Sequence, residues 1–199
     1  MSTTEQSIGT VTQAVKKDTC PVCSVLRQVQ TDIVKYLEPD GANVVCNFHG
    51  WAVAHAAPAE SVAAIFGRLL ESLAESKPST RCDLCDFIRE QEERTLEELS
   101  REFASRALFV EWMRKHGSLC LRHAVLLKNR LPDALQLVVT QIVARNIAEL
   151  RGELQAFNQR VRLGEHSGGG LLGRVAEFLL SQRGIIRSDF PAQWADRSH

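Results

Sequence analysis

The sequence is constrained above all by a cysteine–histidine motif that occurs twice and uses every cysteine of the chain. Each copy consists of a CxxC pair followed later by a CxxH pair. The first copy supplies Cys20, Cys23, Cys46 and His49, and the second supplies Cys82, Cys85, Cys120 and His123. Because the same residue types recur in the same order, a common chemical role for the two copies is the simplest interpretation.

The local spacing of the motif indicates metal binding. Two cysteines separated by two residues can direct both sulfur atoms at one ion through a tight turn, and a Cys and a His three residues apart share a helix face. Three thiolates and one imidazole complete the shell of a closed, tetrahedral zinc site. We therefore predict one Zn²⁺ at Cys20, Cys23, Cys46 and His49 and a second at Cys82, Cys85, Cys120 and His123. Crossed ligation between the two copies is the less favoured arrangement.

An iron–sulfur protein is the main alternative to zinc. Three cysteines and a histidine can also hold a cluster, and two clusters in one chain would serve electron transfer or redox sensing. His49 and His123 would then tune the reduction potential. The closely spaced cysteine runs of many cluster proteins do not occur here, which favours zinc.

Two further uses of cysteine explain less of the pattern. Buried free cysteines act as small apolar residues, and the histidines could be core or capping residues, but neither role requires the repeated spacing. The stretch "CPVC" alone resembles the redox dithiol of glutaredoxin-like proteins. That role lacks the expected βαβ pattern and leaves Cys46, Cys120 and both motif histidines unused.

The residues between the motifs predict an all-α fold, because helix formers dominate and alternating β-branched runs do not appear. Pro58 and Pro132 each lie nine residues after a motif histidine and precede a predicted helix start. Apolar periodicity predicts two buried helix faces, with Val62, Ile65, Phe66, Leu69, Leu70 and Leu73 on one and Val138, Val139, Ile142, Val143 and Ile147 on the other. An earlier helix carries Leu26, Val29, Ile33 and Leu37 and stops near Pro39 and Gly41.

Internal duplication with an insertion in the second copy predicts four segments. They are a flexible N-terminus at 1–19, a first helical unit at 20–77, a second at 78–163, and a Gly-rich linker, short amphipathic helix and tail at 164–199. The insertion, Ile88–Gly117, reads as one long charged helix or two shorter ones. Its run "REQEERTLEELSRE" is typical of a solvated helix face. The last helix is expected to start near Leu171 and to be closed by Gly184.

Four aromatic and histidine residues near the motifs are left out of the predicted ligand set. Trp51 and Trp112 are expected to pack in the core. His55 and His116 are interpreted as solvated or capping residues.

Composition and charge narrow the classes of function. Lys plus Arg and Asp plus Glu both number 24, so no overall basic field draws the chain to nucleic acid or acidic membranes. Neither CxxC…CxxH unit has the two-histidine spacing of a DNA-binding zinc finger. The sequence shows neither a signal peptide nor a membrane-spanning run, which predicts a cytoplasmic protein. No catalytic motif emerges, since "SGGGLLGR" lacks the Lys-Ser/Thr ending of a phosphate-binding loop.

The tandem motifs also resemble an uncharacterised family of small bacterial proteins with duplicated cysteine–histidine motifs and no assigned activity. The resemblance covers Cys20 to about Leu150 and rests on Cys20, Pro21, Cys23, Cys46, His49, Cys82, Cys85, Cys120 and His123. It implies metal binding without implying a reaction. Four protein ligands also leave no open position for substrate, so we predict a non-catalytic helical scaffold that presents a surface to a protein partner.

Overall fold

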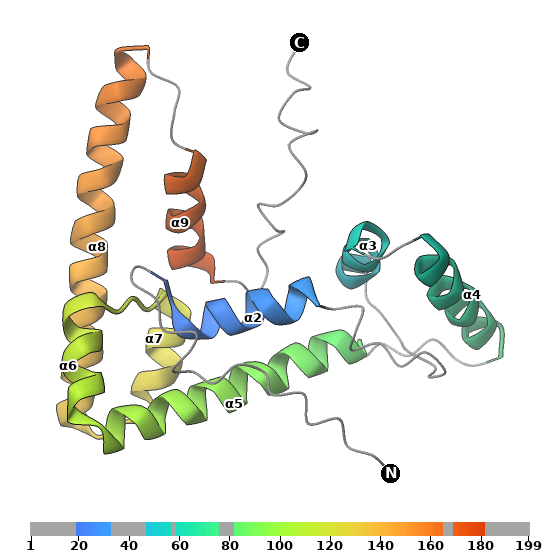
Figure 1. The fold of residues 1–199 in the computed structure, drawn as a ribbon, viewed down its shortest axis with the longest axis horizontal. Coiled ribbons are helices and arrows are strands. Elements are labelled where there is room, and N and C mark those ends of the chain that lie inside the picture. Colours follow the sequence, from blue (N-terminus) through green and yellow to red (C-terminus); the bar gives the residue numbers. More distant parts are fainter. Residues whose placement is uncertain (1–18, 33–46, 57–58, 76–81, 165–168, 182–199) are drawn as a thin grey trace. The chain divides into compact units, whose positions relative to one another are not determined.

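The computed structural model describes residues 19–32, 47–56, 59–75, 82–164 and 169–181. These residues form eight α-helices and contain no strand, so the predicted all-α class is confirmed for this part of the chain (Figure 1). The helices are α2 (Pro21–Thr31), α3 (Asn47–Ala56), α4 (Ala59–Glu75), α5 (Asp83–Ser105), α6 (Ala107–His116), α7 (Leu121–Lys128), α8 (Asp133–Arg162) and α9 (Gly169–Leu180).

The chain divides into two compact units, one of which is built from two separate stretches of the sequence. One unit joins the residues up to Ser24 with those from Leu96 onward, and the other comprises Val25–Thr95. We call them unit 1 and unit 2. The predicted segments 20–77 and 78–163 each contribute residues to both units, and the proposed duplication stays a prediction.

Unit 2 contains α3, α4, most of α2 and the first part of α5. Within it, α3 packs against α4, and α4 begins directly after Pro58, as predicted. The buried apolar residues are Val25, Leu26 and Val29 of α2, Val53 of α3, Ile65 of α4, and Leu84 and Ile88 of α5. Leu26 and Val29 were both expected on a buried face; Ile33 and Leu37 lie outside the described residues.

Two predictions of burial in unit 2 are wrong. Leu70 is 68% exposed and Trp51 is 64% exposed. At about 100° per residue, Leu70 lies about 140° around α4 from the buried Ile65. Trp51 likewise lies about 160° around α3 from the buried Val53. The predicted apolar stripe on α4 was therefore too wide, and Trp51 faces solvent.

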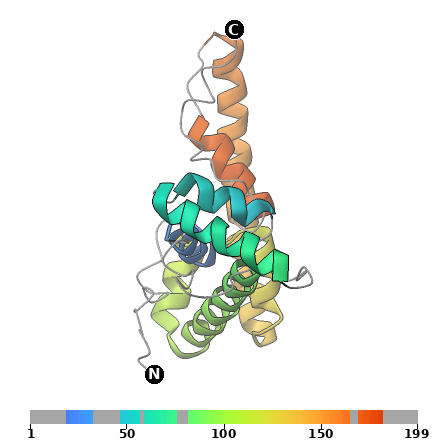
Figure 2. The same cartoon turned by 90° about the vertical axis from the view of Figure 1, so that its right-hand side faces the viewer.

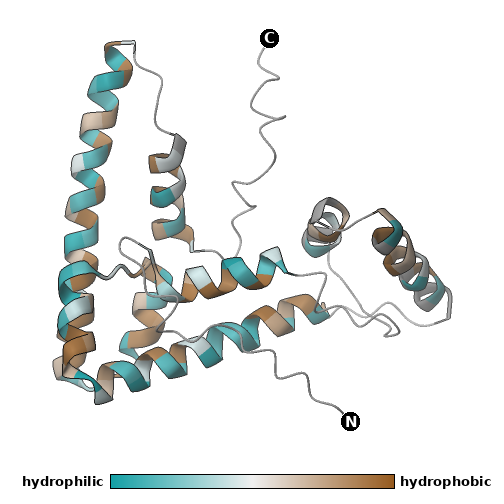
Figure 3. Ribbon diagram, viewed as in Figure 1, coloured by the Kyte–Doolittle hydropathy of each residue, from teal (hydrophilic) through white to brown (hydrophobic). Residues whose placement is uncertain are grey.

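The charged run of α5 is not simply a solvated face. Figure 3 shows hydrophilic residues along much of this helix, with hydrophobic residues recurring among them. Gln91 and Glu92 are nevertheless buried, as is Thr95, whose hydroxyl donates to the Gln91 carbonyl at 2.6 Å. Because Glu92 lies one turn after the buried Ile88, it occupies the inward face of α5. Surface pairs such as Arg94–Glu90, at 2.5 Å, occupy the opposite face as predicted.

Unit 1 has a core drawn from six helices, including the first turn of α2. The insertion forms two helices, α5 and α6, separated at Arg106, whose backbone is extended (φ −129°, ψ 93°). The rings of Phe103 and Phe109 meet edge to face across this break, with centroids 5.6 Å apart. Both α6 and α7 pack against α8, and α9 packs against α7 and α8. Apart from the cysteines, the remaining core residues are Val22, Leu96, Leu99, Met113, Leu119, Ala124, Leu127, Leu131, Val139, Ile142, Leu171 and Phe178.

The long helix α8 starts after Pro132, as predicted, and α9 lies beside it in both views (Figures 1 and 2). Val139 and Ile142 are fully buried, but Ile147 is 41% exposed, so its predicted burial is wrong. Ile147 lies about 140° around the helix from Ile142. After α8, Gly164 adopts the left-handed conformation (φ 86°) that glycine tolerates best.

The helix α9 is less one-sided than the predicted amphipathic helix. It buries Leu171 and Phe178 and exposes Leu172, Leu179 and Leu180. Gly184 lies outside the described residues. None of the described helices combines the length and apolar character needed to cross a bilayer.

Candidate metal centre

The cysteine motifs lie at helix N-termini. Cys20, Cys82 and Cys120 directly precede α2, α5 and α7. In each case the cysteine carbonyl accepts the first helical hydrogen bond, from Ser24, Asp86 and Ala124 at 2.9, 3.1 and 2.9 Å. The second candidate ligand of each pair therefore lies in the first turn of a helix, rather than across an isolated tight turn. These residues are Cys23, Cys85 and His123. The partial positive charge of a helix N-terminus stabilises thiolates placed there.

Four motif side chains meet in unit 1, and we call this cluster site 1. It contains Cys20, Cys23, Cys120 and His123, and their ligand atoms all lie within 4.8 Å of one another. His123 Nδ1 lies 3.5 Å from Cys20 Sγ, 3.4 Å from Cys23 Sγ and 3.1 Å from Cys120 Sγ. The sulfur atoms of Cys23 and Cys120 are 3.7 Å apart. The imidazole nitrogen thus lies close to all three sulfur atoms.

These distances match the edges of one coordination tetrahedron. Zn–S bonds of about 2.3 Å and Zn–N bonds of about 2.05 Å give S···S edges of about 3.8 Å and S···N edges of about 3.6 Å. The S···N distances of 3.1 to 3.5 Å and the S···S distance of 3.7 Å are close to those values. The residues therefore fit a single tetrahedral ion.

Site 1 is shielded from water, which changes the acidity of its thiols. All four side chains are at most 4% exposed. Burial raises the pKa of Cys20, but hydrogen bonds with Cys120, Cys23 and His123 outweigh it and hold that pKa well below its usual value. Hydrogen bonding to Cys120 raises the pKa of Cys23, and hydrogen bonding to Cys20 raises the pKa of Cys120. Thiolates are the forms of cysteine that bind a metal ion, so a divalent cation would stabilise all three sulfur atoms in that form.

Three motif side chains meet in unit 2, and we call this cluster site 2. It contains His49, Cys82 and Cys85. His49 Nδ1 lies 3.3 Å from Cys82 Sγ and 3.4 Å from Cys85 Sγ. Cys82 and His49 are buried, whereas Cys85 is half-buried. Burial lowers the pKa of His49, which favours the neutral imidazole that a metal requires.

The predicted grouping of the ligands by chain order is wrong. Site 1 combines the CxxC pair of the first copy with the CxxH pair of the second, and site 2 combines His49 with the second CxxC pair. Cys46 lies outside the described residues. The order of the motifs in the sequence could not predict the grouping, because both copies supply the same donor types at the same local spacing. Nothing in a CxxC pair itself selects one CxxH pair over the other.

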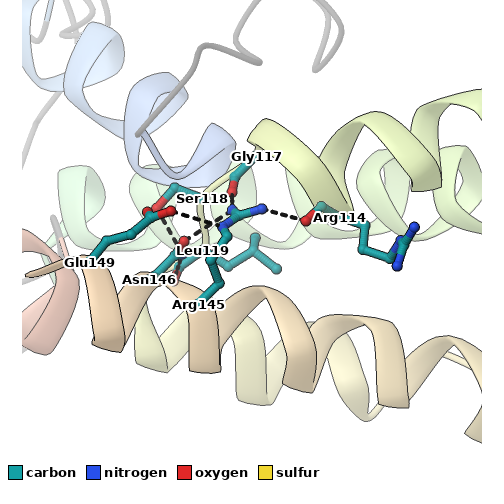
Figure 4. Close-up of polar contacts among 7 residues, drawn as sticks. All are labelled: Arg114, Gly117, Ser118, Leu119, Arg145, Asn146 and Glu149. Atoms are coloured by element: carbon teal, nitrogen blue, oxygen red, sulfur yellow. Dashed lines mark hydrogen bonds and ion pairs between the residues drawn. The ribbon is translucent and has the colours of Figure 1, made fainter.

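The residues around site 1 include a polar network that sequence reasoning missed (Figure 4). Asn146 of α8 is 4% exposed and donates from Nδ2 to Ser118 Oγ at 3.0 Å and to the Leu119 carbonyl at 3.5 Å. Its neighbour Arg145 donates to the carbonyls of Arg114 and Gly117. Asn146 follows Val139 and Ile142 at the spacing of the buried face of α8. A polar residue at such an inward position is the sequence signal that could have predicted this network.

The remaining histidines and tryptophans that the structure describes are not members of either cluster. His116 is exposed and its ring lies 6.0 Å from that of the half-buried Trp112. The side chain of His55 lies outside the described residues.

Comparison of the chain with family models, with curated proteins and with solved structures finds no match. The chemistry of sites 1 and 2 is therefore the basis for assigning a function.

Proposed function

We propose that this protein is a non-catalytic helical scaffold that binds two zinc ions through crossed Cys₃His sites. Site 1 uses Cys20, Cys23, Cys120 and His123. Site 2 uses His49, Cys82 and Cys85, with Cys46 as its fourth ligand. Each ion then links a CxxC pair from one motif copy to a CxxH pair from the other.

The geometry of site 1 is the observation that carries this proposal. Three sulfur atoms and one imidazole nitrogen converge in a buried cluster at the spacing of one tetrahedral shell. Four such ligands leave no position for a substrate, which favours a structural over a catalytic ion.

The same geometry favours a single ion over an iron–sulfur cluster. In a cluster the protein ligands are divided among two or more iron atoms, and bridging sulfides separate those atoms. Ligands on different iron atoms therefore lie farther apart than the edges of one tetrahedron. At site 1 all four ligand atoms lie within 4.8 Å of one another, which fits one ion. Zinc suits this site because it readily accepts thiolate and imidazole in tetrahedral geometry.

The assignment of Cys46 to site 2 rests on its position in the motif. His123 is the third residue of α7, and Cys120 directly precedes that helix. His49 is the third residue of α3, and Cys46 directly precedes that helix in the sequence. The same local offset would place the Cys46 sulfur beside the His49 imidazole.

We further propose that the zinc-bound helices present a surface to a protein partner in the cytoplasm. Exposed leucines on α9, including Leu172, Leu179 and Leu180, support a protein rather than a nucleic-acid partner. The equal numbers of acidic and basic residues support the same choice.

Metal analysis of the full-length chain, purified without oxygen, tests the proposal. We expect colourless protein with about two zinc ions per chain, one for each Cys₃His site. Stoichiometric iron with acid-labile sulfide, and an absorption spectrum bleached by dithionite, would instead establish an iron–sulfur protein.

Paired substitutions test the crossed grouping. Cys20→Ser and Cys120→Ser remove ligands of one site, so the double variant should retain one zinc ion. Cys82→Ser with Cys120→Ser removes ligands from both sites and should retain none. Ligation in chain order predicts the opposite result for the two pairs. His123→Ala also removes a ligand of site 1. Its matched control is His116→Ala, because His116 is an exposed histidine of the same unit.

A further inference from the structure

The loop that leads into site 1 is held by two residues of α8. This loop, Gly117–Cys120, joins the end of α6 to the start of α7. Its Ser118 hydroxyl and Leu119 carbonyl both accept hydrogen bonds from the buried Asn146 amide, at 3.0 and 3.5 Å. Figure 4 shows Asn146 and Arg145 reaching from α8 to this loop.

Arg145 fixes the start of the same loop. Its guanidinium donates to the Arg114 carbonyl in the last turn of α6 and to the Gly117 carbonyl just after that helix. These carbonyls have no partner within the helix, so a cation at this end satisfies them and complements the helix dipole. Arg145 Nη2 also donates to Asn146 Oδ1 at 3.1 Å, which orients the amide of Asn146. Glu149 lies 3.5 Å from Arg145 Nε.

At Gly117 the loop passes so close to Met113 that there is no room for a side chain. A Cβ at this position would lie 2.5 Å from Met113 Sδ and 2.9 Å from Met113 Cα. Any larger residue would therefore displace the loop or the buried Met113. The start of the loop is confined by packing, and its middle is confined by Asn146.

We propose that Asn146, oriented by Arg145, is a positioning residue for the metal ligand Cys120. Leu119 directly precedes Cys120, so the hydrogen bond to the Leu119 carbonyl fixes the backbone from which the Cys120 sulfur extends. Metal–ligand distances tolerate deviations of only about 0.2 Å. This inference rests on the proposed function of site 1 and assigns to α8 a role in metal affinity.

Site-resolved metal release from the full-length chain tests this role. Zinc-loaded protein is incubated with increasing chelator and then with a thiol-alkylating reagent, and mass spectrometry reports which cysteines have become reactive. Asn146→Leu keeps the branched shape of the side chain but cannot donate a hydrogen bond. We expect it to release Cys20, Cys23 and Cys120 at about tenfold lower chelator concentration, because loss of a hydrogen bond that orients a ligand typically weakens metal binding about 10- to 100-fold.

Site 2 serves as an internal control, since the reactivity of Cys82 and Cys85 should not change. Val139→Ala is the matched control on α8, because Val139 is fully buried but lies about two turns before Asn146. It should leave the release of site 1 within about twofold of the parent despite a loss of stability. Asn146→Gln retains an amide donor and should lose less affinity than Asn146→Leu.

The results distinguish this role from the proposed function. If zinc protects the cysteines of the parent but Asn146→Leu shifts site 1 by less than about twofold, the positioning role is wrong. An equal shift in Val139→Ala also overturns it, because general destabilisation would then explain the effect. If zinc protects no cysteine in the parent, the proposed function itself is wrong. Should Asn146→Leu not fold, Ser118→Ala removes one acceptor and should produce a smaller shift at site 1 alone.

Discussion

Sites 1 and 2 each combine a CxxC pair with a motif histidine but connect the chain over different distances. Site 1 joins residues 97 to 103 positions apart, and site 2 joins residues 33 to 36 positions apart. Site 1 is buried throughout, whereas site 2 includes the half-buried Cys85. In site 1, Asn146 and Arg145 hold the loop that carries one ligand.

The difference shows how one local motif can serve two structural purposes. Site 1 ties together the two separate stretches that make up unit 1, between which the chain of unit 2 is inserted. Site 2 lies within the continuous unit 2. Loop-closure entropy grows with loop length, so an ion at site 1 should restrict the unfolded chain more strongly.

The largest effect is expected from removing a ligand of site 1. Cys120→Ala should cost several kcal/mol of unfolding free energy and exceed the loss from Cys82→Ala. On the chain-entropy model for crosslinks, closure of a loop of about 100 residues contributes about 4.7 kcal/mol, against about 3.8 kcal/mol for about 35 residues. Urea unfolding of zinc-loaded parent and variants, with metal content verified, measures both losses. An equal or larger loss in Cys82→Ala would remove the proposed distinction between the sites.

The next largest effect concerns the core that supports site 1. Leu127 of α7 is fully buried, so Leu127→Ala should lower the unfolding free energy by about 2–5 kcal/mol. Val125→Ala, on the exposed side of the same helix, is the control and should change it by less than about 0.5 kcal/mol. Thermal unfolding of both variants measures the difference. If the two substitutions are equivalent, α7 does not pack as described.

A kinetic comparison should separate the sites in the unaltered protein. The half-buried Cys85 gives reagents easier access to site 2 than to site 1. With chelator present and a thiol-alkylating reagent in excess, Cys82 and Cys85 should react on the order of tenfold faster than Cys20 and Cys23, which corresponds to about 1.4 kcal/mol in opening free energy. Labelling followed by peptide mass mapping gives the rates. Faster labelling of the site 1 cysteines would reverse the comparison of accessibility.

The smallest effect is expected from surface ion pairs in unit 1. Hydrogen bonding to Arg114 and then Lys115 lowers the pKa of Glu111 from 4.5 to about 2. Because the folded-state pKa is the lower one, this contribution is present above the unfolded pKa and is lost as pH falls toward 2. Glu111→Gln should therefore slightly destabilise the chain, equally at about pH 7 and about pH 6.

Paired urea unfolding curves at the two pH values test that expectation, with the exposed Glu97→Gln on α5 as control. A destabilisation that disappears between these pH values would require a pKa for Glu111 well above 2. A loss comparable to that of Cys120→Ala would show that surface charge, rather than the metal sites, dominates the stability of unit 1.

Much of the local structure could be predicted because it depends on neighbouring residues. Pro58 and Pro132 precede the starts of α4 and α8, and Leu26 and Val29 are buried together on α2. Predictions about the wider environment of a helix were less reliable. Leu70 and Ile147 are apolar at nearly the right spacing but lie beyond the covered face. How wide a helix face is buried depends on what packs against it, and periodicity alone does not contain that information.

The sequence by itself determined the types of the candidate ligands and their local spacing, because these are set by residues within one helical turn of one another. Only the tertiary structure decided that Cys20 and Cys23 meet Cys120 and His123, while Cys82 and Cys85 meet His49. It also placed Asn146 beside the loop of Cys120. Both CxxC pairs offer identical thiols, so exchanging their CxxH partners changes no local interaction. The choice depends on how the helices between the motifs pack, and that packing is a property of the whole chain.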